Sequence, residues 1–251
     1  MRIDQLLVQR QLASTRSQAQ RLISGGVEWL QGEAWKRVVK NGDEVPDSAE
    51  LRLLDDAEAR YVSRGGLKLE AALKHIGLNA KDRVCLDVGQ STGGFTDCLL
   101  QAGATRVVGL DVGQAQLHPQ LREDPRVLCI EKLNARDVQA VSEALEGEAP
   151  DGGFDLLVGD LSFISQTLVL PAVVPWLKGG GHLLMLVKPQ FELQPGQVGK
   201  GGIVRDAAFY PQIEQRLRDA CAALDLAVQD WFDSPIEGGD GNREFFIHAI
   251  K

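Results

Sequence analysis

Long apolar runs are missing from this chain of 251 residues. The most apolar stretch, residues 168–177, is short and contains Pro171 and Pro175, whereas a helix that crosses a membrane needs about 20 apolar residues. No apolar segment follows the opening Met1-Arg2-Ile3-Asp4. We therefore expect no signal peptide, no membrane insertion and a cytoplasmic location.

Residues spaced as metal ligands are also missing. The four cysteines form no C-x-x-C pair, and the four histidines share no metal-ligand spacing. We expect buried, reduced thiols and no metal site. The residues concerned are Cys85, Cys98, Cys129, Cys221, His75, His118, His182 and His248.

Two phosphate-binding patterns are absent as well: G-x-x-x-x-G-K-[ST], and the G-x-G-x-x-G of dinucleotide sites. What the chain does contain is CLDVGQSTGGFTD at residues 85–97, a short apolar strand that turns through Gly89, Gly93 and Gly94 into a helix. Such a turn lets a ligand lie against the backbone. Glycine-rich turns occur in many folds, so this loop alone is weak evidence.

A second acidic strand end strengthens the case for a nucleoside. Asp111 follows the strand at 106–110, twenty-four residues beyond Asp87, and is placed to accept both hydroxyls of a ribose. S-adenosylmethionine carries an ammonium and a sulfonium but no phosphate, so it suits a loop with a carboxylate. Asn134 follows the third strand, where adenine would lie. Asn134 or Asp137 could equally cap the next helix.

Charge is unevenly distributed along the chain. The net charge is −8, yet residues 1–40 contain seven Lys or Arg and only three acidic residues, which leaves −12 for the remainder. Such asymmetry indicates separate tasks for the two parts. Arg16 and Arg21 share a polar helix face with Gln18 and Gln20. That face could follow a phosphate backbone or be an ordinary solvated surface.

The first 55 residues predict a small α+β unit. We expect a helix at 3–9 with Leu6 and Leu7 inward, and a second helix through Ile23. The second helix would begin at a Thr15–Gln18 capping box and end at Gly25-Gly26. Short strands should follow near 27–30, 37–39 and 51–54.

This order of features resembles the S4 RNA-binding domain of ribosomal proteins and rRNA-modifying enzymes. The chain departs from that domain at Val27-Glu28-Trp29, where Val-x-Val-Asn is more usual. The resemblance implies RNA contacts, and we expect them from Arg2, Arg16, Arg21 and Arg64.

The remainder predicts a doubly wound α/β domain. Residues 55–60 are polar and form the expected hinge, so we predict domains at 1–58 and 59–251. Strands are expected near 83–88, 106–111, 127–131, 154–159, 182–187, 227–233 and 244–250, with helices around 94–102, 137–146, 165–176 and 207–224. A turn at 236–242 would make the last strand antiparallel. Seven such strands form the Rossmann-like sheet of S-adenosylmethionine-dependent methyltransferases.

Four charged residues stand where strands or glycine turns end: Lys68, Asp160, Lys188 and Glu244. Taken singly, each could simply reach solvent. Together they match the K-D-K-E tetrad of FtsJ-like ribose 2′-O-methyltransferases. The surrounding VSRGGLKL, GDLSFIS, LVKPQFE and SPIEGGDGNREF resemble the TlyA, or hemolysin A-like, family, which joins an S4 domain to such a catalytic domain.

The resemblance implies methylation of cytidine ribose in ribosomal RNA or ribosomal subunits. It places Lys188 nearest the hydroxyl, Asp160 beside the sulfonium and Lys188, and Lys68 and Glu244 around the nucleotide. Carboxylates beside a lysine favour its ammonium form, so Lys188 could steer the hydroxyl or act as a base. We expect S-adenosylmethionine to be bound by Asp87, Gly89, Ser91, Gly93, Phe95, Asp111, Asn134 and Asp160.

Other interpretations stay open at this point. The protein could be an RNA-binding ribosome-assembly factor without activity, or a membrane-damaging hemolysin, although no basic amphipathic helix supports the latter. The segment 194–206, with four glycines, Lys200 and Arg205, could close on RNA or be an ordinary connection. We expect a monomer.

Overall fold

A computed structural model describes residues 1–13, 15–54, 59–236 and 241–251. It divides into two compact units, Met1–Leu67 and Lys68–Lys251, which are described separately below. The expected hinge at 55–60 and the expected turn at 236–242 lie partly outside the described residues. The domain boundary predicted after residue 58 therefore stays a prediction.

The first unit contains two helices and a three-stranded antiparallel sheet. Helices α1 (Ile3–Gln9) and α2 (Arg16–Gly26) precede strands β1 (Val27–Gln31), β2 (Ala34–Arg37) and β3 (Leu51–Leu53), in the sheet order β2-β1-β3. Leu6 and Leu7 are buried in its core. The Thr15 hydroxyl accepts the Gln18 backbone N–H and so caps α2.

One expectation about this unit was wrong in detail. The second strand was expected at 37–39 and lies at Ala34–Arg37, because Gln31 pairs with Ala34 across a two-residue turn in which Gly32 has φ +67°. Helix α2 ends at Gly26, within the glycine pair that was expected to end it.

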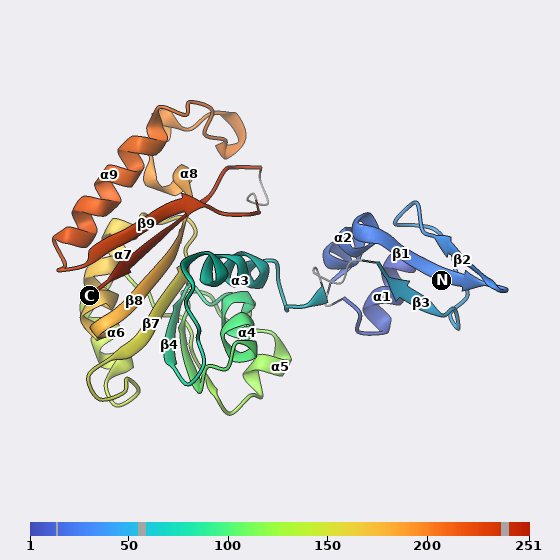
Figure 1. Cartoon of the computed structure of the whole chain (residues 1–251), viewed down its shortest axis with the longest axis horizontal. Coiled ribbons are helices and arrows are strands. Elements are labelled where there is room, and N and C mark those ends of the chain that lie inside the picture. Colours follow the sequence, from blue (N-terminus) through green and yellow to red (C-terminus); the bar gives the residue numbers. More distant parts are fainter. Residues whose placement is uncertain (14, 55–58, 237–240) are drawn as a thin grey trace. The chain divides into compact units, whose positions relative to one another are not determined.

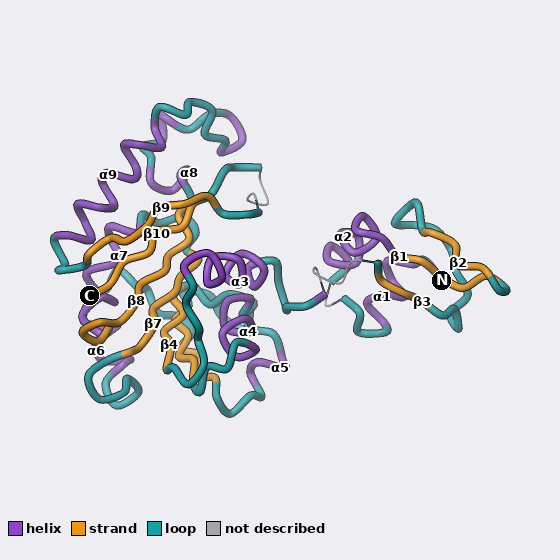
Figure 2. Tube along the Cα trace, viewed as in Figure 1, coloured by secondary structure: helices purple, strands orange, loops and turns teal. Residues whose placement is uncertain are grey.

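The second unit is a seven-stranded sheet in the order β6-β5-β4-β7-β8-β10-β9 (Figures 1 and 2). The strands are β4 (Val84–Val88), β5 (Arg106–Leu110), β6 (Val127–Ile130), β7 (Phe154–Asp160), β8 (Leu177–Val187), β9 (Ala227–Asp233) and β10 (Phe245–Ile250). Strand β10 runs antiparallel between β8 and β9, and the other neighbouring pairs are parallel. The predicted Rossmann-like methyltransferase sheet is confirmed.

Helices cover both faces of this sheet. Figure 1 shows α3 (Gly65–Ile76), α4 (Gly94–Gln101) and α5 (Pro119–Arg122) on one side. On the other side are α6 (Val138–Leu145), α7 (Gln166–Val173) and α9 (Phe209–Ala222), whose buried side chains share one apolar core with the strands. A short helix, α8 (Pro189–Glu192), follows β8 directly.

Strand β8 is longer than expected because it begins at Leu177 rather than near residue 182. Its first part is Lys178 followed by three glycines, and glycine is depleted in strands, so the apolar pattern starts too late in the sequence. The helix expected at 165–176 ends as α7 at Val173 and continues as a 3-10 turn, Val174–Trp176.

Candidate active site

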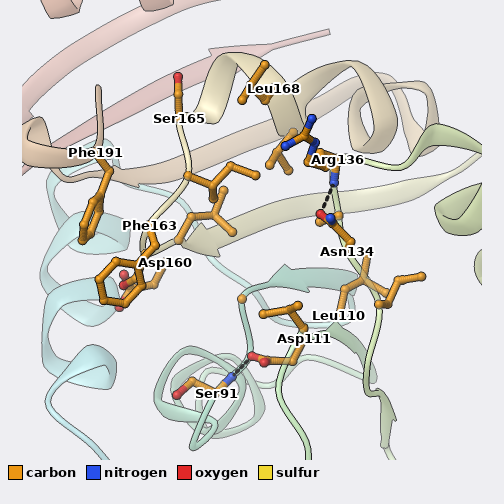
Figure 3. A pocket seen from close by; sticks show the side chains of 18 of the residues that line it. Ser91, Leu110, Asp111, Asn134, Arg136, Asp160, Phe163, Ser165, Leu168 and Phe191 are labelled. Carbon is orange, nitrogen blue, oxygen red and sulfur yellow. Dashed lines mark hydrogen bonds between the residues drawn. The ribbon is translucent and has the colours of Figure 1, made fainter. Parts of the chain in front are cut away.

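A cavity of about 980 Å³ opens at the edge of the sheet where β4, β5 and β7 end (Figure 3). Parallel α/β sheets bind ligands at this edge. Five of the predicted cofactor residues line the cavity: Gly89, Ser91, Asp111, Asn134 and Asp160. These five residues of the cavity lining were therefore predicted from the sequence.

The loop after β4 approaches β7 so closely that a side chain would not fit. Gly89 has φ +84°, and a Cβ there would lie 2.7 Å from the carbonyl oxygen of Asp160. Gly93 has φ +94°, and a Cβ there would clash with the Leu121 side chain. Gly89 thus shapes the cavity, whereas Gly93 allows the start of α4 to pack on α5.

Asp111 follows β5 and holds the glycine-rich loop in place. Its Oδ2 accepts the Ser91 N–H at 2.6 Å and its Oδ1 accepts the Gly113 N–H at 2.6 Å. Figure 3 shows Asp111 and Ser91 joined at the floor of the cavity. The carboxylate is therefore oriented before any ligand binds.

Asn134 and Asp137 were the two candidates to cap the helix after β6, and the structure gives the cap to Asp137. Asp137 caps α6, because its carboxylate accepts the Ala140 N–H at 3.1 Å. Asn134 lines the cavity, and its side-chain oxygen accepts the Arg136 N–H at 3.2 Å. The helix cap thus leaves Asn134 at the cavity wall.

Asp87, Gly93 and Phe95 are not among the residues that line the cavity. Asp87 is fully buried, and burial raises the pKa of its carboxyl to about 7. The Thr96 hydroxyl donates to Asp87 at 2.7 Å and accepts from Gln90 at 2.8 Å. Phe95 is buried and stacks on Phe246 at 6.4 Å between centroids. Both side chains lie behind the loop, where they support it.

The four residues of the predicted tetrad form two ion pairs in the second unit. Lys68 on α3 pairs with Glu244, and Lys188 Nζ lies 2.5 Å from Asp160 Oδ1. Asp160, Lys188 and Glu244 come from the ends of β7, β8 and β10, which are neighbours in the sheet. The sheet order therefore brings together residues that are far apart in sequence.

The two pairs also interact with each other. Burial raises the pKa of Glu244, Lys68 and Lys188 oppose that rise, and Asp160 adds to it. Glu244 and Lys68 are nearly inaccessible, with side chains 3% and 8% exposed, whereas Asp160 is 26% exposed and lines the cavity. Lys188 is 14% exposed and is not among the residues that line the cavity, but Asp160 and Ser162, the two residues it contacts, both line it.

Several residues of the site were not singled out from the sequence. Phe163 has φ +64° and a side chain 90% exposed, and its ring packs on Phe191 with centroids 4.9 Å apart. Ser162 accepts a hydrogen bond from Lys188 Nζ at 3.0 Å. The segments GDLSFIS and LVKPQFE contain these residues, but nothing in their pattern predicts that two loops meet. Gln116, Arg136 and Gln190 also line the cavity.

The predicted RNA-binding arginines of the first unit have partners within the protein. Arg2 and Arg16 both donate to the fully buried carboxylate of Asp4, at 3.0 and 2.9 Å, and keep about half of their side chains exposed. Arg21 and Arg64 are half-buried. Arg2 and Arg16 thus have a structural role, because they neutralise the buried Asp4 carboxylate. Contact of the four arginines with RNA stays a prediction.

The segment 194–206 is tied to the strand that carries Glu244. The buried Asn242 side chain accepts the Val204 N–H at 2.9 Å and donates to the Gly202 carbonyl at 2.9 Å. Two 3-10 turns, Pro195–Gln197 and Lys200–Gly202, give the segment its shape. It is an ordered connection in this structure.

The described part of the chain contains neither a membrane-spanning helix nor a metal cluster. No described helix is both long and apolar enough to cross a bilayer. Among the residues that the structure covers, no group of three or more His, Cys, Asp or Glu is arranged to hold a metal ion.

Known solved structures share this fold. The chain superposes on a Streptococcus thermophilus protein described as a hemolysin with a TM-score of 0.74 at 39% identity, covering 100% of this chain and 88% of that one. A fibrillarin from Aeropyrum pernix, solved with S-adenosyl-L-methionine, matches at TM-score 0.51 and 18% identity over 72% of this chain and 73% of that one. The second likeness concerns the fold alone.

Sequence comparisons are more specific. The chain is 43% identical to the 16S/23S rRNA (cytidine-2′-O)-methyltransferase TlyA of Mycobacterium tuberculosis, over 98% of this chain and 88% of that protein. It is 36% identical to Hemolysin A of Brachyspira hyodysenteriae over the whole of both. Residues 61–251 match the FtsJ-like methyltransferase family and residues 1–26 match the S4 domain. The chain therefore belongs to the TlyA, or hemolysin A-like, family of FtsJ-like methyltransferases.

Proposed function

We propose that this protein transfers a methyl group from S-adenosylmethionine to the ribose 2′-hydroxyl of a cytidine in ribosomal RNA. The observation that carries the proposal is the ion pair between Lys188 and Asp160, of which Asp160 lines the cavity, with the buried Lys68–Glu244 pair near enough to interact with it. The choice of cytidine and of ribosomal RNA as the substrate follows the reaction for which the Mycobacterium tuberculosis relative is named.

The residues of the cavity fit S-adenosylmethionine. About 980 Å³ is at the upper end of small-molecule sites, and the absence of a Cβ at Gly89 lets the loop lie directly against Asp160 at the cavity wall. Asp111 offers oriented carboxylate oxygens to a ribose diol, and Asn134 offers an amide to an adenine edge. Asp111 and Asp160 place negative charge around a ligand that carries a sulfonium and an ammonium. When bound, the cofactor supplies an electrophilic methyl group.

The protein's own groups would act on the acceptor hydroxyl. A ribose hydroxyl is a very weak acid, so attack is faster where the charge that develops on its oxygen is stabilised. We assign that role to the Lys188 ammonium, which Asp160 and Ser162 hold in place at 2.5 and 3.0 Å. As the hydroxyl oxygen bonds the methyl carbon, its proton would pass to water, and the bond from that carbon to sulfur would break with its electron pair left on sulfur, which gives S-adenosylhomocysteine.

Binding of the RNA would be shared between the units. The S4 match covers residues 1–26, which include Arg2, Arg16 and Arg21. Each phosphate that such arginines neutralise adds a salt-dependent contribution to affinity. Arg2 and Arg16 would provide such contacts, since Asp4 holds both side chains in place and about half of each is exposed.

The test is a methylation assay with purified protein, methyl-labelled S-adenosylmethionine and ribosomal subunits that lack the modification. We expect label in 2′-O-methylcytidine, located by nuclease digestion and mapping. Lys188→Ala should lower the rate at least about 100-fold, and Lys81→Ala, at an exposed position, should not. Label on a base, or equal rates for both variants, would refute the proposal.

A further inference from the structure

Two loops at the rim of the cavity contact each other through a series of side chains. One loop follows β7 and comprises residues 161–165, and the other comprises residues 188–192 after β8. Lys188 donates to Ser162 at 3.0 Å, and Phe191 packs on Phe163 at 4.9 Å. Glu192 completes the series with Ser165 and Gln166. Figure 3 shows Phe163 and Phe191 ring to ring beside Asp160.

Glu192 makes the most buried of these contacts, with only 4% of the residue exposed. Its Oε2 accepts the Ser165 hydroxyl at 2.6 Å and its Oε1 accepts the Gln166 N–H at 2.8 Å. Ser165 is the N-cap of α7. Glu192 therefore fixes the point at which the 161–165 loop enters that helix.

Arg216 of α9 supports Glu192 from the other side. Its guanidinium lies 3.8 Å from Glu192 Oε2 and donates to the backbone carbonyl of the same residue. A buried carboxylate is tolerated where it is hydrogen-bonded and paired. Ser165, Gln166 and Arg216 together meet that condition, while burial raises the pKa of Glu192.

The loop that Glu192 anchors is strained and needs such an anchor. Phe163 has φ +64° although it is not glycine, and strained residues of this kind persist only where their surroundings hold them. The ring of Phe163 is 90% exposed, so its own burial contributes little. The loop is held by the contacts from Lys188 to Ser162 and from Glu192 to Ser165, together with the apolar side chains of Leu161 and Ile164 in the core.

We propose that Glu192 is a positioning residue for methyl transfer. It holds the 161–165 loop so that Ser162 meets the Lys188 ammonium and Phe163 stays at the cavity rim. This inference rests on the function proposed above, because Lys188 is the group assigned to the acceptor hydroxyl. A displacement of about 1 Å at such a group can cost about 100-fold in rate. Glu192 acts through these residues and does not itself line the cavity.

The first test measures the loop itself. In Glu192→Ala, hydrogen exchange followed by mass spectrometry should become faster in peptides that cover 161–167 and stay unchanged in peptides from β9. Glu192→Gln keeps an acceptor for the Gln166 N–H and should retain most of the protection. The matched control is Glu214→Ala, which removes a half-buried glutamate paired with Arg218 on α9. Unchanged exchange in Glu192→Ala would overturn the inference.

The second test separates positioning from cofactor binding. We expect Glu192→Ala to lower kcat about 10- to 100-fold while the Kd for S-adenosylmethionine, measured by calorimetry, changes less than about threefold. Glu192→Gln should recover most of the rate. Faster exchange with normal kcat, or a loss confined to cofactor affinity, would overturn the inference.

A double-mutant cycle with Ser165→Ala tests the route of the effect. If Glu192 acts through Ser165, the two losses in kcat should be far from multiplicative. Multiplicative losses would overturn that route. If the wild-type protein methylates no RNA while exchange responds as expected, the proposed function fails and the loop contact stands.

Discussion

Lys68 and Glu244 are 176 positions apart in the chain, and their charged groups form an ion pair with almost no exposure to solvent. Each charge makes the burial of the other tolerable. Removing one partner from a buried pair leaves an uncompensated charge, which is far more costly than losing a surface pair.

Lys68→Met should therefore lower the free energy of unfolding by about 3–5 kcal/mol, measured by urea denaturation. The double variant Lys68→Met, Glu244→Leu should recover most of that loss, because no charge is then buried alone. Arg126→Met removes an exposed pair with Asp124 and should cost less than about 1 kcal/mol. Similar losses for Lys68→Met and Arg126→Met would argue against the burial of the pair.

Asp111→Asn should weaken cofactor binding. An amide provides one acceptor oxygen instead of two, so the variant loses the Ser91 or the Gly113 hydrogen bond together with the negative charge. The hydrogen bonds that the ribose hydroxyls would donate to the charged Asp111 carboxylate contribute about 1.5–3 kcal/mol, and a neutral amide would keep only part of this. The Kd for S-adenosylmethionine, measured by calorimetry, should therefore rise roughly 10- to 100-fold.

The control for that experiment is Asp82→Asn. Asp82 is exposed and has φ +61°, a conformation that Asn also adopts readily. It should bind the cofactor as the wild type does. An Asp111→Asn protein with unchanged affinity would remove Asp111 from the binding site.

Asp87 should make stability depend on pH. Burial raises its pKa from the usual 3.8 of an aspartate to about 7, so between these pH values the folded protein holds a proton that the unfolded chain lacks. The free energy of unfolding should therefore fall as pH rises through this range, by up to about 1.4 kcal/mol per pH unit.

Asp87→Asn should remove this decline, because an amide does not titrate. The measurement is the difference between wild-type and variant unfolding free energies from pH 4 to 7. Asp151→Asn, on an exposed turn, should leave the wild-type slope intact. A difference that is flat with pH would show that Asp87 is already ionised at the lower end.

Phe163→Asn should separate stability from activity. Asn accepts a left-handed backbone more readily than Phe, and the replaced ring is 90% exposed, so stability should hold or rise by up to about 1 kcal/mol. We expect the exposed ring of Phe163 to stack on a base of the RNA, and loss of such a contact, worth about 1–3 kcal/mol, should lower kcat/KM for RNA roughly 5- to 100-fold. Phe163→Tyr keeps the ring and should stay active. An active, more stable Asn variant would leave the exposed ring unexplained.

The sequence by itself determined the sheet and pointed to five of the residues that line the cavity. The features that could be predicted are local patterns, which depend on residues close together in the sequence. They are the alternation of strands and helices, the acidic residue at the end of β5 and the glycine-rich turn after β4. For the same reason, the S4-type order of helices and turns could be recognised in the sequence. So could the four charged residues that follow strands or a glycine turn.

What only the tertiary structure decided depends on contacts between distant segments. No pattern in the sequence shows that Asp87 is enclosed, that Asp137 rather than Asn134 caps a helix, or that Asn242 ties down the 194–206 segment. The pairing of Phe163 with Phe191 likewise arises because the sheet order places β7 beside β8, and Lys68 of α3 pairs with Glu244 at the start of β10 across 176 positions of the chain. Burial and pairing are properties of the folded neighbourhood, and they set the charge and position of each group.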